Sequence, residues 1–490
     1  RADKVDIICA SMGCMVTTAY FYYCNTESVD SSVYVSGVHN GTYSFGNAIN
    51  GNIELNTDVL LSYIYELTDG DLILNLLLKV FDILGAVDYL VDFAKARGLA
   101  YRRDEHDNVI IKKAATPGYE DRPTVILQGH TDMVKQCLDG YSEKFDSEGV
   151  TLKRNGDILF AEGTTLGADD GIAVAYMLAI LSGTELSHPP IEALFTSDEE
   201  IGLIGAASFN YDTLNGRTMI NIDSDREGIF TVGCAGGCRI DINLPLMRDI
   251  EGGSFYKLEI SGLRGGHSGT EINAGRENAI KILAEVLSAL PELRISQMTG
   301  GSADNAIPRS ATAIFSSGIK HSGELFRAVQ AVTEKHKDTE SEIQFEITTV
   351  ASATLPFTKD SSAKIVRLIT EEPYGVIEMS GDIEGLVETS INLGIVDTKE
   401  NALFLTASAR SSKNEKRETL VKKVLNIAKK FGAECNVHGD YPAWEYRRNS
   451  ELRELMCRVY ERMYGKRAEV MAIHAGLECG IFAGALENLD

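Results

Sequence analysis

The chain contains 490 residues, enough for two or three domains of roughly 150 residues whose cores need no disulfide. Its 71 Asp and Glu residues outnumber its 47 Lys and Arg residues, and the formal net charge of −24 disfavours nucleic acid as a partner because phosphates would be repelled. Apolar residues make up 44% and charged residues 24%, which is typical of a globular protein and excludes the disordered, collagen-like and disulfide-rich classes.

Residues 1–85 form an N-terminal segment of atypical character. Ser, Thr, Gly, Asn and Tyr interrupt its short apolar runs, and Ser32–Val38 alternates like an edge strand. The stretch Ile7–Thr26 carries no charge, as a weak export signal or membrane segment would. Its polar and Gly content and its lack of a leucine-rich core argue against both interpretations. We therefore assign no chemistry to this segment and expect no membrane partner.

An orderly pattern begins at Ala86. The sequence predicts an amphipathic helix over Ala86–Arg97 and a strand over Asn108–Lys112. Four short apolar runs follow, and each of them ends at potential metal ligands. The runs are Thr124–Gly129 before His130, Ile191–Thr196 before Asp198–Glu200, Met219–Ile222 before Asp223, and Val470–Ile473 before His474.

Each of these runs predicts a buried strand with chemistry at its carboxyl end. A helix predicted over Ile172–Leu181 separates the first two runs, as a strand–helix–strand unit requires. Open α/β sheets bind ligands beyond the carboxyl ends of their strands, so we expect the side chains that follow the four runs to converge. Because the last run lies far along the chain, we expect the sheet to be discontinuous in sequence.

The middle of the chain predicts a separate α+β domain. Apolar stripes indicate helices over Glu277–Leu290 and Glu418–Phe431. Strand-like pieces alternate with them at Tyr256–Ile260, Ala311–Ser316, Ile343–Val350 and Ala402–Ala407. We therefore divide the chain into a mostly parallel α/β catalytic domain, residues 86–236 and 441–490, and an inserted α+β lid domain, residues 237–440.

The cysteine pattern indicates free thiols. The nine cysteines are scattered, odd in number and never arranged as a CxxC pair, so we expect a reducing, cytoplasmic compartment. Cys234 and Cys238 flank Ala-Gly-Gly and have the spacing of a metal hook, but no second pair follows. We interpret both as buried structural thiols.

The side chains at the strand ends have the composition of a site for two cations. Such a site needs oxygen and nitrogen ligands and one carboxylate that bridges the ions. His130 can ligate while Asp132, two residues on, orients its imidazole. The pair Asp169 and Asp170 precedes a helix that could hold a bridging carboxylate rigidly. In the pair Glu199–Glu200, one carboxylate can ligate while the other acts as general base.

Taken singly, these residues also have structural explanations. A His at a strand end is commonly a buried residue with satisfied hydrogen bonds, and acidic pairs commonly cap helices or face solvent. Four apolar runs that end in His, Glu, Asp and His, together with an Asp pair flanked by Gly, are hard to explain by capping alone. Their joint occurrence favours the metal site.

Between Ala86 and Phe482 the chain resembles the aminoacyl-histidine dipeptidases, also called Xaa-His or carnosinase-like dipeptidases. This family is a branch of the dizinc aminoacylase and carboxypeptidase superfamily. The matching strings occur in the family's order, and the last is specific to this branch. They are Gln128–Val134 (QGHTDMV), Gly163–Gly171 (GTTLGADDG), Glu199–Gly202 (EEIG), Asn221–Ser224 (NIDS), Gly265–Gly269 (GGHSG), Asn305–Arg309 (NAIPR) and Ile473–Gly480 (IHAGLECG).

The resemblance implies a role for each site residue. It implies that one Zn²⁺ takes His130 and Asp223, that the other takes Glu200 and His474, and that Asp169 bridges the two. It further implies that Glu199 is the catalytic base and that Asp132 steadies His130. In the inserted domain, His267 and Asn305 resemble lid residues that stabilise the oxyanion. Arg410 resembles the arginine that binds the terminal carboxylate of the substrate.

Two departures from the family pattern limit this transfer. The family opens with a helix and a turn that contains Pro and His, whereas here about 80 residues of different character come first. At the other end the chain stops at Leu489–Asp490, where the family continues through a loop that contains His-Thr-Pro. We expect a substrate-contacting loop to be missing, at a cost to turnover or stability.

The resulting prediction is a dinuclear zinc metallopeptidase that hydrolyses dipeptides, with His as the second residue. Co²⁺ and Mn²⁺ are possible substitutes because carboxylates and imidazoles bind all three metals. A small peptide is the expected partner, and the family implies a homodimer. Two alternatives stay open: a deacylase of N-acyl amino acids or a carboxypeptidase with the same metals, and a non-catalytic metal-binding relative.

Overall fold

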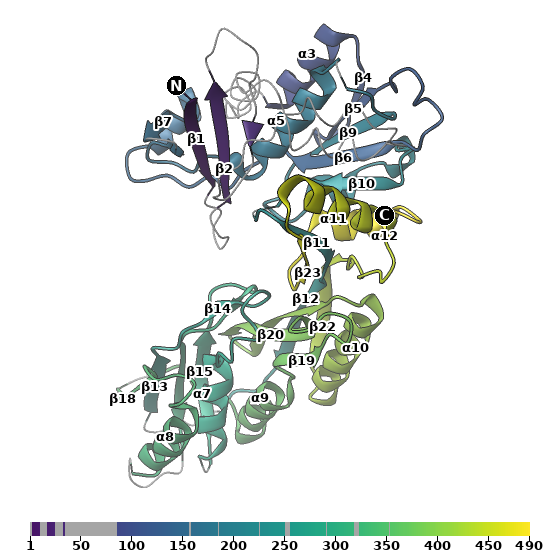
Figure 1. Ribbon diagram of the computed structural model, residues 1–490. Coiled ribbons are helices and arrows are strands. Elements are labelled where there is room, and N and C mark those ends of the chain that lie inside the picture. Colours follow the sequence, from purple (N-terminus) through teal and green to yellow (C-terminus); the bar gives the residue numbers. More distant parts are fainter. Residues whose placement is uncertain are drawn as a thin grey trace. The chain divides into compact units, whose positions relative to one another are not determined.

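The computed structural model describes two compact units. It covers residues 86–490 except 156–157, 185, 225, 250–254, 291, 318–322 and 352, together with the backbone of three strands before residue 86. The first unit comprises Arg1–Val232, Arg447–Met471 and Ile481–Asp490, and the second comprises Gly233–Tyr446 and Ala472–Gly480 (Figure 1). No helix in this described part is long and apolar enough to cross a membrane.

The first unit is built on a mixed sheet with the strand order β10-β6-β9-β5-β4. Strands β10, β6 and β9 are parallel, whereas β5 and β4 run antiparallel to their neighbours. Every residue of β6 and β9 is buried, which explains why both strands are mostly apolar, with Gln128 and Glu192 as buried polar exceptions. The bounds are β4 Ala100–Arg103, β5 Val109–Lys113, β6 Val125–His130, β9 Ile191–Thr196 and β10 Thr218–Asn221.

Two predicted helices cover this sheet (Figure 1). Helix α3, Ala86–Arg97, has the predicted bounds, with Leu90 and Phe93 buried against the sheet and Gly98 after its last turn at φ 64°. Helix α5, Ala168–Ser182, packs along β6 and is buried over most of its length. It begins four residues before the predicted Ile172 because its first turn holds two acids, which favour a helix N-terminus but break the apolar pattern.

Outside this core, the first unit contains a second sheet and further helices, and α12 begins in the second unit. A second sheet has the order β3-β2-β1-β8-β7, and its β3 covers two residues of the predicted strand Ser32–Val38. The other residues of the segment 1–85, including those of Ile7–Thr26 that belong neither to β1 nor to β2, lie outside the described residues. The bounds are β1 Ala2–Cys9, β2 Thr17–Cys24, β3 Val33–Tyr34, β7 Leu152–Asn155, β8 Ile158–Ala161, α4 Ser142–Glu148, α6 Ile204–Ser208, α11 Glu451–Tyr464 and α12 Glu478–Ala485.

The prediction that the fourth apolar run joins the central sheet, which would make that sheet discontinuous in sequence, is wrong. The fourth apolar run forms β23, Glu469–Ile473, but this strand pairs with β11, Ile229–Cys234, in a separate two-stranded sheet. Only Ala472 in β23 is fully buried, so its apolar residues do not belong to the central core. The outer edge of β10 is instead occupied by Asp490, which exchanges backbone hydrogen bonds with Met219 and Arg217 at 2.8 and 2.9 Å.

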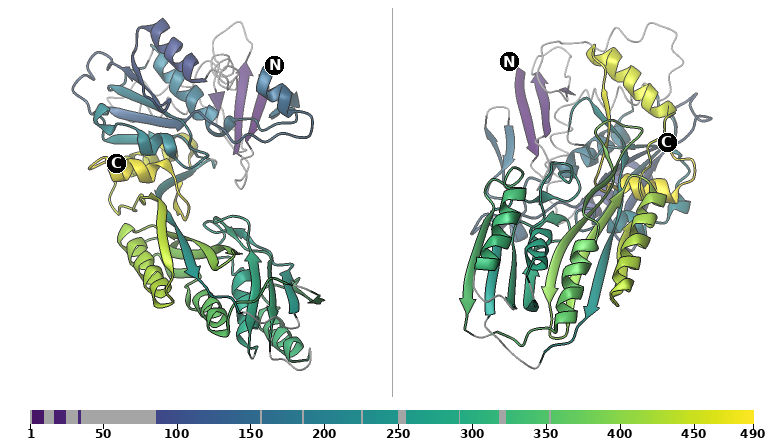
Figure 2. Two further views of the ribbon diagram at one scale, coloured as in Figure 1. Left: turned by 180° about the vertical axis from the view of Figure 1, so that it is seen from behind. Right: turned by 90° about the horizontal axis from the view of Figure 1, so that it is seen from below.

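The second unit is a sheet with helices on one face (Figure 2). The described strands follow the order β18-β13-β17-β15-β20-β21-β12-β22, with β19 also paired to β20, and β14 pairs with β16 apart from this sheet. The strands are β12 Gly236–Pro245, β13 Phe255–Ser261, β14 Gly266–His267, β15 Arg294–Gly300, β16 Ala306–Ile307, β17 Ala311–Ser316, β18 Gln344–Val350, β19 Gly375–Met379, β20 Val387–Thr398, β21 Ala402–Ser411 and β22 Glu434–Tyr441. The helices are α7 Ala279–Ser288, α8 Gly323–His336, α9 Lys359–Glu371 and α10 Asn414–Lys430.

The predicted helices of this unit are confirmed with shifted ends. Helix α7 begins after Asn278 because the Asn278 side chain accepts hydrogen bonds from the backbone N–H groups of Ile280 and Lys281. Helix α10 begins at Asn414, a turn before the predicted Glu418, because its first turn is polar. With these elements the predicted α/β fold class is confirmed.

Candidate metal centre

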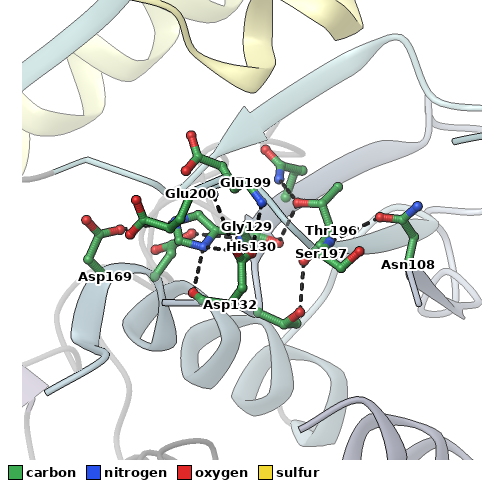
Figure 3. Close-up of polar contacts among 12 residues, drawn as sticks. Asn108, Gly129, His130, Asp132, Asp169, Thr196, Ser197, Glu199 and Glu200 are labelled. Atoms are coloured by element: carbon green, nitrogen blue, oxygen red, sulfur yellow. Dashed lines mark hydrogen bonds and ion pairs between the residues drawn. The ribbon is translucent and has the colours of Figure 1, made fainter. Parts of the chain in front are cut away.

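Three strand ends and one helix start bring acids and an imidazole together in the first unit (Figure 3). His130 is the last residue of β6, Glu199 and Glu200 follow β9, and Asp223 follows β10. Asp169 lies in the first turn of α5, where its own backbone departs from helical angles. Parallel strands end at the same edge of a sheet, which explains why residues so far apart in sequence meet here.

The ligand atoms lie close enough to share cations. Those of His130, Asp169 and Asp223 are all within 4.8 Å of one another, and the same holds for His130, Glu199 and Glu200. The Nε2 atom of His130 lies 3.1 Å from Oδ1 of Asp169. Two ligands of a tetrahedral Zn²⁺ are about 3.4 Å apart, given metal–ligand distances near 2.1 Å. The residues present therefore fit a metal centre.

Hydrogen bonding determines which nitrogen of His130 faces this centre. Its Nδ1 lies 3.0 Å from the backbone carbonyl oxygen of Asp132, which can only accept, so Nδ1 donates. In the neutral ring Nε2 then carries the lone pair that a metal requires. Burial lowers the pKa of His130, but the carboxylates of Asp132 and Asp169 outweigh it and hold that pKa well above its usual value.

Asp132 connects two loops of the centre. Its carboxylate accepts hydrogen bonds from the backbone N–H groups of Glu199 at 3.0 Å and Glu200 at 3.1 Å. The same carboxylate is 3.6 Å from Nδ1 of His130, so the backbone carbonyl of Asp132 makes the shorter contact to the imidazole. Burial raises the pKa of Asp132, but His130 and the two N–H groups lower it by more. The pKa therefore lies below its usual value, and this carboxyl stays ionised.

The two neighbouring aspartates of α5 point in different directions. Asp169 faces His130, whereas Asp170 is 2% exposed and its Oδ2 accepts a hydrogen bond from the backbone N–H of His130 at 3.2 Å. Burial and the charge of Asp223 raise the pKa of Asp170 well above its usual value. Asp170 therefore supports the strand end from beneath, while Asp169 is the member that faces the centre.

The local charge also favours cations. Four carboxylates, those of Asp169, Glu199, Glu200 and Asp223, surround one imidazole. Burial and the neighbouring Asp169 raise the pKa of Glu200 to about 7. Bound divalent cations would remove this repulsion and favour the ionised carboxylates.

Sequence reasoning missed a row of polar side chains beneath the centre. The Asn221 amide donates to Oε1 of Gln128 at 2.6 Å, and the Gln128 amide donates to the Thr196 hydroxyl at 3.0 Å. These residues come from β10, β6 and β9, so the row connects the three strands that carry the site. The signal was a Gln inside an otherwise apolar strand, since a buried amide requires partners.

Gly129 allows β6 to approach α5. A Cβ at this position would lie 2.5 Å from Oδ2 of Asp170 and 2.6 Å from Cβ of Ala173. We expect Gly129→Ala to lower the free energy of unfolding by about 1–3 kcal/mol, as overpacking does, and to displace His130. Urea denaturation of the purified variant measures this change, and a loss below about 0.5 kcal/mol would show that β6 can move away from α5 without strain.

Two other predicted site residues meet in the second unit. Strand β14 pairs with β16, and the backbone N–H of Ser268 donates to the carbonyl oxygen of Asn305 at 2.8 Å, which brings the chain at His267 beside Asn305. The Nδ1 atom of His267 accepts from the N–H groups of Gly269 at 3.3 Å and Thr270 at 3.2 Å. The proton of neutral His267 is therefore on Nε2, and burial followed by the charge of Arg410 lowers the pKa of this imidazole.

Arg410 and His474 also belong to the second unit. Arg410 is 8% exposed and donates through Nη1 to the hydroxyl of Tyr441 at 3.0 Å. The Nε2 atom of His474 lies 2.7 Å from the hydroxyl of Ser390. Burial and then the charge of Arg410 lower the pKa of His474 to about 3, so its imidazole is neutral. The ligand role predicted for His474 stays a prediction.

The metal-hook interpretation of two cysteines is not supported. Cys234 and Cys238 are buried, and burial raises the pKa of each thiol to about 11. A thiol must lose its proton to bind a metal, so both remain structural residues. The six cysteines whose side chains the structure describes are free thiols: Cys137, Cys234, Cys238, Cys435, Cys457 and Cys479.

Comparisons with known proteins identify similar chains. A family described as the peptidase dimerisation domain matches residues 258–344. The cytosol non-specific dipeptidase of Escherichia coli (strain K12) is 35% identical over 412 residues, which cover 82% of this chain and 85% of that protein. The structure of aminoacylhistidine dipeptidase from Vibrio alginolyticus has a TM-score of 0.78 and 34% identity, over 86% of this chain and 89% of that one. A probable carboxypeptidase of Arthroderma otae is 27% identical over 62% of this chain and 65% of its own length.

Proposed function

Because the chain belongs to the M20 family of metallopeptidases, we propose that it hydrolyses dipeptides with two divalent metal ions. The observation that carries this proposal is the cluster of acids and His130 at one edge of the sheet in the first unit. Two relatives, one named a non-specific dipeptidase and the other an aminoacylhistidine dipeptidase, support a dipeptide substrate. We propose Xaa-His dipeptides as the preferred class.

The ligand sets follow the predicted assignment. His130 and Asp223 would hold one ion, Glu200 and His474 the other, and Asp169 would bridge them. In support, the ligand atoms of His130, Asp169 and Asp223 lie within 4.8 Å of one another. Imidazole and carboxylate ligands suit Zn²⁺, with Co²⁺ or Mn²⁺ as substitutes. The Nε2 atom of His130, which lies 3.1 Å from Oδ1 of Asp169, supports this assignment. When bound, two such ions make an attacking water more acidic and polarise the carbonyl of the scissile peptide bond.

The protein's own groups would move the proton. Glu199, the acid left without a ligand role, would take a proton from the attacking water and deliver it to the leaving amine. Asp132 accepts a hydrogen bond from the backbone N–H of Glu199 and so fixes the backbone position from which the Glu199 side chain extends. A base placed beside the metal ligands supports an enzyme over a purely metal-binding relative, because metal storage needs no such group.

The second unit supplies groups suited to the substrate. His267 has its proton on Nε2 and can donate it in a hydrogen bond to the developing oxyanion, with the Asn305 amide as a second donor. Arg410 is a buried cation whose natural partner is the terminal carboxylate of a dipeptide. We also propose a homodimer, supported by the dimerisation-domain match, and a cytoplasmic location, like that of the Escherichia coli relative.

Metal removal and substrate choice test this function. We expect a chelator to reduce hydrolysis of a β-alanyl-histidine or glycyl-histidine substrate by at least about a hundredfold, because both water activation and carbonyl polarisation depend on the ions. Added Zn²⁺, Co²⁺ or Mn²⁺ should restore activity, as measured by release of free His. Full activity in a protein shown to be metal-free would contradict the proposal.

Parallel assays separate the alternatives. The similarity to a probable carboxypeptidase makes longer peptides with a free carboxyl terminus the main competing substrates, and N-acyl amino acids test the deacylase function. Faster cleavage of either class than of dipeptides would replace the dipeptidase assignment. If the metal-loaded protein cleaves none of the three classes, the non-catalytic relative is the better description.

A further inference from the structure

The guanidinium of Arg410 lies buried, and no described acidic residue pairs with it. In the part of the chain that the structure describes, the hydroxyl of Tyr441 is its hydrogen-bond partner and no carboxylate pairs with it. His267 and His474, whose pKa values Arg410 lowers, are neutral neighbours. A buried cation is unfavourable unless an anion pairs with it, so this position is suited to bind an anion.

Tyr441 reaches Arg410 across an intervening strand. Tyr441 of β22 is the register partner of Gly237 in β12, and Gly237 is in turn the partner of Arg410 in β21. Two strand spacings separate the backbones of Tyr441 and Arg410 by roughly 10 Å. Their side chains nevertheless meet at 3.0 Å, which requires that nothing project from Gly237 between them.

Two glycines make room for the Tyr441 ring. A Cβ on Gly237 would lie 2.5 Å from the hydroxyl oxygen of Tyr441, and a Cβ on Gly476 would lie 2.7 Å from its Cε2. Neither glycine has a positive φ, so each is required by space and not by backbone conformation. Burial raises the pKa of the Tyr441 phenol, which therefore stays protonated.

The contact with Tyr441 leaves one edge of the guanidinium available. Tyr441 binds Nη1, whereas Nε of Arg410 is buried and has no hydrogen-bond partner among the described residues. The edge formed by Nε and Nη2 can donate two parallel hydrogen bonds to one carboxylate. The contact with Nη1 restricts rotation of the planar group and so fixes the direction of that edge.

We propose that Tyr441 is a positioning residue that orients Arg410 to bind the terminal carboxylate of the substrate with its Nε–Nη2 edge. The inference rests on the proposed function, which assigns the carboxylate to Arg410. Tyr441 itself does not touch the substrate in this scheme. Its hydroxyl is required for binding, and Gly237 and Gly476 are required for its ring to fit.

Tyr441→Phe tests the role because it removes only the hydroxyl. We expect KM for a dipeptide to rise roughly tenfold while kcat changes less than about twofold, as for loss of one hydrogen bond to a charged group that aids binding. The preference for the dipeptide over its C-terminal amide, expressed as the ratio of kcat/KM values, should fall by the same factor. Calorimetry with a dipeptide analogue whose peptide bond is reduced should show the same loss in Kd.

Comparison with Arg410→Ala separates the carboxylate-binding role of Arg410 from the positioning role of Tyr441. This variant should lose most of the preference for the free carboxylate. If it does and Tyr441→Phe retains the wild-type preference, the positioning role is wrong and the dipeptidase assignment stands. If Arg410→Ala keeps the preference, the carboxylate role of Arg410 is wrong, and the inference about Tyr441 fails with it.

Two further variants serve as controls. Tyr460→Phe removes a buried tyrosine hydroxyl from the first unit, where it contacts Glu227 at 3.4 Å, and should leave KM and the carboxylate preference unchanged. Gly237→Ala places a methyl group against the Tyr441 hydroxyl and should raise KM as Tyr441→Phe does, in protein whose folding is checked by thermal unfolding. A folded Gly237→Ala variant with wild-type KM would contradict the proposed geometry.

Discussion

Glu199→Gln should lower kcat by about 10²–10⁴-fold while the protein keeps its metal ions, because a general base contributes that much and a ligand is not removed. The variant is nearly isosteric and leaves the backbone N–H that Asp132 binds. Steady-state kinetics on a dipeptide, combined with metal analysis of the same sample, measures both quantities. KM should change only a few-fold, since Glu199 acts on the water and not on substrate binding.

Neighbouring acids provide matched controls for this result. Asp198→Asn changes the preceding residue, whose φ of 52° Asn tolerates as well as Asp, and should leave kcat within about twofold. Glu200→Gln should instead reduce the metal content, because Glu200 is the proposed ligand of the pair. If Glu199→Gln loses metal and Glu200→Gln keeps it, the two roles are exchanged.

Asp169→Asn should remove the bridge between the two ions. An amide offers one oxygen and no charge, so we expect metal content to fall from about two ions per chain to less than one. The loss of Lewis-acid assistance, about 4 kcal/mol, corresponds to a decrease in kcat/KM of about a thousandfold or more. Metal analysis after extensive dialysis and kinetics at saturating Zn²⁺ measure the two effects.

Asp139→Asn is a suitable control because Asp139 is an exposed carboxylate of the same unit. It should retain both ions and wild-type kinetics. An Asp169→Asn variant that still binds two ions with unchanged affinity would show that Asp169 does not bridge them. The contact between Asp169 and Nε2 of His130 would then be an ordinary hydrogen bond.

The sequence predicted the elements that carry the site because their signals are local. The runs before His130, Glu199 and Asp223 became β6, β9 and β10 with ends within two residues of those expected. Burial on both faces requires mostly apolar residues along a strand, and that pattern is visible without a structure. Helix ends were less predictable, since the polar first turn of α10 breaks the apolar stripe.

The same local signal failed for the run before His474. Val470–Ile473 has the apolar character of a core strand, but β23 pairs with β11 and only its Ala472 is fully buried. Strand pairing depends on which edges are free after the rest of the chain has folded, and the edge of β10 is occupied by Asp490. An apolar run therefore predicts a strand without predicting its partner.

The sequence by itself determined which residue types occur, in what order, and at the ends of which strands. That was sufficient for the fold class and for the candidate ligands. Only the tertiary structure decided that Asp169 faces His130 while Asp170 supports its backbone, and that Tyr441 contacts Arg410 over Gly237. Apolar periodicity is a property of neighbouring residues, whereas the direction of a side chain depends on space and hydrogen-bond partners supplied by distant strands.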